Sequence, residues 1–135
     1  MVLARLATPL AGLLYAAAIG KLDEVAPLRW RPEHAVTVVV ASKGYPGSPR
    51  GGDVIEGMPE IGDRAYVLHA GTALEKDGTI VSAGGRVLSV VATGADLAEA
   101  RERVYRAVKR IKLKGSTHRT DIALAAQHGE ISVAQ

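Results

Sequence analysis

The run from Ala35 to Ala41 constrains the fold most, because consecutive β-branched residues fill the space between its two alanines. Side chains branched at Cβ favour strands, and an uninterrupted apolar run of this length is typical of a buried strand. Residues Arg86 to Ala92 form the last clear strand pattern. The shorter strands expected around them cover residues 53–56, 64–69, 72–74 and 79–81, and a Lys76-Asp77-Gly78 turn joins the last two.

The strongest helical pattern follows the last strand. Asp96 and Glu99 have the D-x-x-E spacing of a capping box, which predicts that a helix begins at Asp96. Glu99 with Arg103, and Glu102 with Arg106, have the i,i+4 spacing of favourable charge pairs. The apolar stripe of this helix comprises Leu97, Ala100, Val104, Ala107, Val108 and Ile111.

A first helix is expected near the N-terminus, with Thr8 as its N-cap, Pro9 at its first position and its end near Ile19. A signal peptide is the alternative for this apolar stretch. It lacks a preceding basic cluster and contains an early proline, so a soluble helix is preferred. A short final helix is expected over residues 122–127. Antiparallel strands with two apolar helix stripes indicate an α+β fold, in which the helices cover one face of a sheet or partial barrel.

The length and composition are those of one globular domain. Of the 135 residues, 47% are hydrophobic and 23% are charged. Because the chain has no Phe, its core must be built from Val, Leu, Ile and Ala. Because it has no Cys, disulfide, zinc–thiolate and thiol chemistry are excluded. The net charge of +3 is too small to indicate nucleic-acid binding by itself.

Gly84-Gly85-Arg86 interrupts the strand pattern and is a candidate anion site. Glycines at positive φ can turn successive amides toward one point and form a nest. An arginine beside them offers a planar fork that matches phosphate oxygens. On these residues alone the alternative is favoured, namely that the glycines form a β-bulge and Arg86 pairs with a surface acid.

The loop from Lys43 to Gly52 is a second candidate, because ordered loops near this length are often functional. It lacks the G-x-x-x-x-G-K-[ST] spacing of a phosphate-binding loop. His69 is expected to be a hydrogen-bonded core residue rather than a base, and the four histidines show no metal-ligand spacing. No catalytic residues and no metal ligands are assigned, since no self-sufficient active site can be assembled from these residues.

Several segments, in this order, resemble the C-terminal part of the glycinamide ribonucleotide synthetase family, also called phosphoribosylamine–glycine ligases. They are A-S-K-G-Y-P-G (41–47), G-D-V-I-E-G (52–57), L-H-A-G-T (68–72), S-A-G-G-R-V-L-S-V (82–90), D-L-A-E-A-R-E-R-V-Y (96–105) and H-R-T-D-I (118–122). The resemblance implies an ATP-grasp ligase of de novo purine synthesis. Such an enzyme joins glycine to phosphoribosylamine with ATP and Mg²⁺ (or Mn²⁺), giving ADP, phosphate and glycinamide ribonucleotide.

The family's N-terminal region, with its ATP and metal segments, has no counterpart in these residues. The resemblance therefore implies a fragment that is inactive alone and binds no cofactor by itself. Residues 1–33 would be the last helix of the ATP-grasp core plus a connector. Residues 34–135 would be the C-terminal domain, of the rudiment single hybrid motif type. The missing ATP-grasp part would be a partner, the compartment would be the cytoplasm, and neither nucleic acid nor membrane is expected.

The resemblance also favours the hypothesis that Gly84-Gly85-Arg86 binds an anion. It implies that Arg86, with the amides of Gly84 and Gly85, contacts the 5-phosphate of phosphoribosylamine. Residues of the loop would line the same cleft, nearer the ribose or glycine; these are Lys43, Gly44, Tyr45, Pro46 and Gly47. The family has glycine where this chain has Lys43, which adds a charge and a side chain at that position. Two alternatives stay open: a packing module without ligand contacts, and a small basic nucleic-acid-binding domain.

Overall fold

The structure is a computed structural model that describes residues 1–58 and 64–131. The helices are α1 (Val2–Arg5), α2 (Leu10–Ala18), the 3-10 helix η1 (Leu22–Glu24), α3 (Leu97–Arg110) and α4 (Leu124–Gln127). The strands are β1 (His34–Ala41), β2 (Ile55–Glu56), β3 (Ala65–His69), β4 (Thr72–Leu74), β5 (Ile80–Ser82), β6 (Arg86–Gly94) and β7 (Lys112–Leu113). The predicted α+β class with antiparallel strands is confirmed, and the described strands form no closed barrel.

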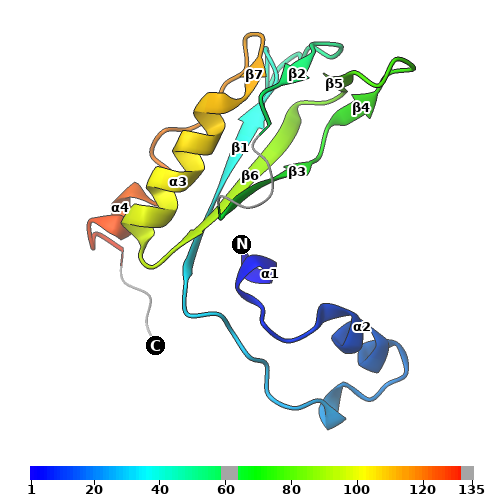
Figure 1. Cartoon of the computed structure of the whole chain (residues 1–135), viewed down its shortest axis with the longest axis vertical. Helices are drawn as coiled ribbons and strands as arrows, with labels where there is room; N and C mark the ends of the chain where they lie inside the picture. Colours follow the sequence, from blue (N-terminus) through cyan, green and yellow to red (C-terminus); the bar gives the residue numbers. More distant parts are fainter. Residues whose placement is uncertain (59–63, 132–135) are drawn as a thin grey trace.

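The central sheet has the order β1-β6-β3, and both of its pairings are antiparallel. Three pairs of directly opposed residues are buried and face α3; they are Val36 with Ala92, Val38 with Val90, and Val40 with Leu88. Side chains of α3 complete this core, namely Ala100, Val104, Ala107 and Val108. Figure 1 shows α3 running along β1 and β6. The core is therefore aliphatic, as the absence of Phe predicts.

The opposite face of the sheet, here called the open face, is the one on which Val39 and Leu68 lie. Both pair with Ser89 of β6, so the three side chains share one face. Val39 is 38% exposed and Leu68 is 51% exposed. This face is therefore less completely covered than the face packed against α3.

The capping box at α3 is confirmed, with one difference. The Asp96 carboxylate accepts a hydrogen bond from the Glu99 N–H at 2.8 Å. The Glu99 carboxylate accepts from the Ala95 N–H at 2.6 Å, one residue earlier than the box predicts. Both i,i+4 ion pairs form, between Glu99 and Arg103 and between Glu102 and Arg106. The capping hydrogen bonds fix where α3 begins, and the ion pairs lie on its solvent-exposed side.

The expectation that two helices cover the sheet is wrong for α2. Ala16 is the buried residue of α2, whereas Leu14 and Tyr15 are exposed, and Figure 1 shows this helix away from the sheet. Thr8 is not its cap, because its hydroxyl accepts the Arg29 N–H at 2.7 Å instead. An apolar stripe predicts that one face of a helix packs against another element, but it does not identify that element.

Candidate functional site

A β-bulge in β6 decides where Arg86 points. Val40 pairs with Leu88, but the next residue, Ala41, pairs with Arg86, so Val87 is an extra residue in β6. In a regular strand Arg86 would share the face of Leu88, which is packed under α3. The extra residue reverses this alternation. Val87 and Leu88 are both fully buried, and Arg86 is exposed on the open face.

Arg86 makes no ion pair with a carboxylate among residues 1–58 and 64–131. The ion pair that the alternative expects between Arg86 and a surface acid is therefore not found in the described chain. The amides of Gly84 and Gly85 likewise donate to no acceptor in these residues. An unpaired guanidinium beside free amides leaves several donors available to an anion.

The nest predicted for Gly84 and Gly85 is not formed, because neither glycine has φ in the left-handed region. These positions are glycine for a different reason, which is close approach. A Cβ on Gly85 would lie 2.5 Å from Cδ2 of Tyr45, and one on Gly84 would lie 3.3 Å from Cα of Gly71. The missing side chain at Gly85 therefore allows the Tyr45 ring to lie on the backbone next to Arg86.

The loop after β1 folds back through short-range hydrogen bonds. The Tyr45 N–H donates to the Ser42 carbonyl at 3.2 Å, and the Arg50 N–H donates to the Lys43 carbonyl at 2.8 Å. Gly44 has φ of +87°, and a Cβ there would lie 2.2 Å from the Ser48 carbonyl oxygen, so only glycine fits this turn. The peptide bond between Tyr45 and Pro46 is cis. This geometry carries Tyr45 toward the sheet.

The end of the loop is fixed to β5. Arg50 makes a two-pronged ion pair with Asp53, with Nε to Oδ2 at 2.6 Å and Nη2 to Oδ1 at 2.5 Å. The hydrogen bond from Arg50 holds the pKa of Asp53 below its usual range. The Gly52 N–H donates to the Ser82 carbonyl, and the Asp53 N–H donates to the Ser82 hydroxyl. Ser82 is 1% exposed, so the end of the loop is attached to a buried residue of β5.

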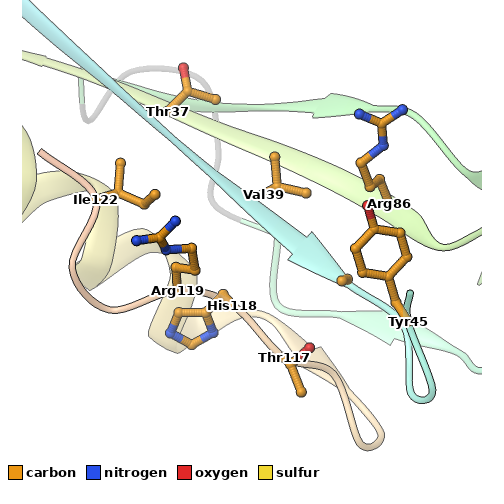
Figure 2. Close-up of a pocket in the computed structure, with 9 residues that line it drawn as sticks. Thr37, Val39, Tyr45, Arg86, Thr117, His118, Arg119 and Ile122 are labelled. Carbon is orange, nitrogen blue, oxygen red and sulfur yellow. The ribbon is translucent and has the colours of Figure 1, made fainter. Parts of the chain in front are cut away.

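Two cavities on the open face share Val39, Tyr45 and Arg86. The loop-side cavity, of about 650 Å³, is lined further by Pro46, Pro49, Ala70, Gly71, Gly85 and Ser89. The tail-side cavity, of about 500 Å³, is lined further by Thr37, Ala41, Thr117, His118, Arg119 and Ile122. Figure 2 shows Tyr45 beside Arg86, with His118 and Arg119 on the other side of β1. Arg86 thus lines both the loop-side cavity and the tail-side cavity.

The predicted site residues fall into two groups. Arg86, Gly85, Tyr45 and Pro46 lie together around the loop-side cavity. Lys43, Gly44, Gly47 and Gly84 do not line either cavity. The Lys43 stem lies against Gly115, since a Cβ on that glycine would be 3.0 Å from Cδ of Lys43. The ligand contacts expected of these four residues stay predictions.

Sequence reasoning did not assign Thr117, His118, Arg119 or Ile122 to the site, although the H-R-T-D-I motif was a visible signal. His69, expected in the core, is exposed, and its Nδ1 lies 3.2 Å from the Thr72 hydroxyl oxygen.

Within the described ranges no group of three or more His, Asp or Glu residues is placed to hold a metal ion. No helix in these ranges has the length and apolar character needed to cross a bilayer.

The fold and the site define a mixed α/β domain whose open sheet face carries a cationic, concave surface. Residues 35–125 match the family described as phosphoribosylglycinamide synthetase, C domain. The chain belongs to this family.

Two curated relatives illustrate the match. The chain is 66% identical over 130 residues to the phosphoribosylamine–glycine ligase of Streptomyces coelicolor, covering 93% of this chain and 31% of that protein. It is 55% identical over 132 residues to the protein of the same name from Mycobacterium tuberculosis strain H37Rv, covering 98% of this chain and 30% of that protein. The chain therefore spans a little under a third of the length of these relatives.

A solved structure supports the same placement. The crystal structure of phosphoribosylamine–glycine ligase from Thermotoga maritima aligns with a TM-score of 0.66 at 36% sequence identity. The alignment covers 80% of this chain and 27% of that one. The observed fold is thus similar to that of one part of the Thermotoga maritima protein.

Proposed function

We propose that this chain is the C-terminal, substrate-contacting part of a phosphoribosylamine–glycine ligase. The whole enzyme would join glycine to phosphoribosylamine at the expense of ATP, in de novo purine biosynthesis in the cytoplasm. Family membership and the names of the relatives support this proposal. The chain alone would be inactive, because it corresponds to under a third of those relatives.

The observation that carries the substrate contact is the outward turn of Arg86 at the bulge. Its guanidinium has no carboxylate partner in the described chain, and it lines both cavities. We assign it, with the amide of Gly85, to the 5-phosphate of phosphoribosylamine. A planar guanidinium can bond two phosphate oxygens at once. Tyr45 and Pro46 would contact the sugar beside it.

ATP and Mg²⁺ (or Mn²⁺) are assigned to the part of the ligase outside this domain. The described residues do not fit the metal, since they offer no cluster of carboxylates or histidines. When bound elsewhere in the enzyme, ATP would supply the phosphoryl group that activates the carboxylate of glycine. The residues of this domain would hold the sugar phosphate so that its amine meets that activated carboxylate.

A chimera tests the proposal. The matched region of the Streptomyces coelicolor ligase is replaced by this chain, and steady-state kinetics are measured with phosphoribosylamine. The chimera is expected to be active. Arg86→Ala should raise the KM for phosphoribosylamine about 10- to 150-fold, which corresponds to one or more lost charged hydrogen bonds, and at least as much as it lowers kcat. Arg86→Lys should also be impaired, because the fork is lost.

Arg106→Ala is the matched control, since Arg106 pairs with Glu102 on the solvent side of α3 and lines neither cavity. It should leave both constants unchanged. A folded chimera without activity would count against the proposed function. An active chimera whose KM is indifferent to Arg86→Ala would instead favour a packing module without ligand contacts.

A further inference from the structure

The turn of residues 117–122 lies across β1 from Arg86. The Thr117 N–H donates to the Ala41 carbonyl at 2.9 Å, and the Ala41 N–H donates to the Thr117 carbonyl at 2.8 Å. Ala41 is also the residue paired with Arg86. Since opposed residues on neighbouring strands project to one face, Thr117 and Arg86 share the open face. The tail-side cavity lies between them (Figure 2).

Two side chains of α3 form hydrogen bonds with the backbone of this turn. The Tyr105 hydroxyl donates to the Arg119 carbonyl at 2.8 Å and accepts from the Ile122 N–H at 3.1 Å. Arg101 donates through Nε to the Ile122 carbonyl at 2.7 Å and through Nη2 to the Thr120 carbonyl at 2.9 Å. One hydroxyl thus links the backbone at Arg119 to the backbone at Ile122.

The turn presents a cation and an imidazole to the tail-side cavity. The Arg119 side chain is 73% exposed and is oriented by Asp121, with Nε to Oδ1 at 2.8 Å and Nη2 to Oδ2 at 2.5 Å. That contact lowers the pKa of Asp121, so the carboxylate stays ionised and keeps holding Arg119. The His118 ring stands 6.2 Å from the Tyr105 ring. Arg119 and His118 line this cavity together with Arg86 and with the apolar side chains of Val39 and Ile122.

We propose that residues 117–122 form the second wall of the sugar-phosphate cleft, and that Tyr105 is the positioning residue that keeps this wall opposite Arg86. Arg119 contacts the bound sugar phosphate from the side away from Arg86, whereas Tyr105 acts only through the turn. This inference rests on the proposed function and adds to it a second group of ligand contacts and the residue that places them.

The test uses the same chimera with Tyr105→Phe and Arg119→Gln, each assayed beside Arg86→Ala. Tyr105→Phe removes the hydroxyl and keeps the ring. Each of the two new variants should raise the KM for phosphoribosylamine about two- to tenfold, as expected for one or two hydrogen bonds lost or misplaced. The kcat should change by less than about twofold, because the turn acts on binding of the sugar phosphate. Arg106→Gln, on the same helix but outside the cavity, is the control.

The outcomes separate the two proposals. If Arg86→Ala raises KM but Arg119→Gln or Tyr105→Phe leaves it at the level of the unsubstituted chimera, the second wall is refuted and the proposed function stands. A Tyr105→Phe variant that lowers the melting temperature without changing KM shows a purely structural tyrosine, and also refutes the inference. If Arg86→Ala itself has no effect, or the folded chimera is inactive, the proposed function fails, and with it the second wall.

Discussion

At the scale of single residues, Gly85 and Tyr45 are the most closely coupled pair of the site. They are 40 positions apart in the chain, yet the tyrosine ring occupies the space that a side chain on Gly85 would need. The absence of a Cβ therefore serves the packing of the loop on the strand. A backbone conformation forbidden to other residues is not involved, since φ of Gly85 lies outside the left-handed region.

Gly85→Ala is expected to displace the Tyr45 ring and to lower the free energy of unfolding by about 1–3 kcal/mol, as overpacking does. The new methyl group would start 2.5 Å from Cδ2 and 3.1 Å from Cε2 of the ring. Urea unfolding of the chain gives the free energy, and the ring resonances of Tyr45 report its displacement.

Gly47→Ala is the control in the same loop. Its Cβ would meet only the Gly44 carbonyl oxygen, at 3.5 Å, which is an ordinary contact. Its effect should stay within about 0.5 kcal/mol. Equal effects of the two substitutions would mean that the loop does not pack on Gly85 as described.

The orientation of Arg86 shows the limit of sequence reasoning at this scale. The residues Gly84-Gly85-Arg86 predict an anion site, but they do not say on which face Arg86 lies. That depends on the offset between Val40 and Ala41 in a strand far away in the chain. The role of Thr117 is equally non-local, because its two backbone bonds go to Ala41. Local patterns carry no information about either pairing.

At the scale of elements, the sheet has one face built for packing and one left open. Leu88 and Leu68 illustrate the difference, since Leu88 is 0% exposed under α3 and Leu68 is 51% exposed on the open face. Leu88 lies on the central strand β6 and Leu68 on the neighbouring edge strand β3, and the two side chains lie on opposite faces of the sheet.

Leu88→Ala should lower the free energy of unfolding by about 2–5 kcal/mol, because it leaves a cavity in the core. Leu68→Ala should cost less than about 1 kcal/mol, since an exposed leucine loses little on truncation. Chemical denaturation of the two variants measures both values. A Leu68→Ala variant as unstable as Leu88→Ala would show that the open face is packed within the chain.

The elements themselves were largely predictable. The β-branched runs gave β1 and β6, and the D-x-x-E pattern gave the start of α3. The strand β7 was missed, because Lys112–Leu113 continues a basic helical pattern and becomes a strand only by pairing with Ile55–Glu56. The covering role expected of α2 was wrong, since periodicity marks an apolar face without naming its partner.

At the scale of the whole molecule, residues 1–33 differ from the rest of the described chain. Exposed large apolar residues are frequent there, including Leu3, Leu14, Tyr15 and Trp30. The family match begins at residue 35, close to the first residue of β1. Both observations support the domain boundary near His34 that the resemblance implies, and this boundary stays a prediction.

A chain that begins at residue 34 should therefore keep the fold of the remainder. It should unfold in a single cooperative transition, with a free energy of unfolding lower by no more than about 3 kcal/mol, the value of one or two apolar contacts. The loss comes from the packing of α1 on β1 and from the cavity near the start of β1 that Val2 and Trp30 line together with Leu97. Calorimetry and amide exchange provide the measurement. A truncated chain that lacks protected amides in β6 would place the boundary elsewhere.

The extra residue Val87 has a consequence for redesign of this scaffold. Side chains alternate between the two faces of a strand, so the pairing offset at Val87 decides which face Arg86 occupies. If Val87 were kept but β6 paired with β1 without this offset, Arg86 would share the face of Leu88, and its charge would be buried beneath α3. Grafts of the glycine segment onto another sheet must therefore copy its one-residue mismatch with the neighbouring strand, because the letters G-G-R alone do not transfer the binding surface.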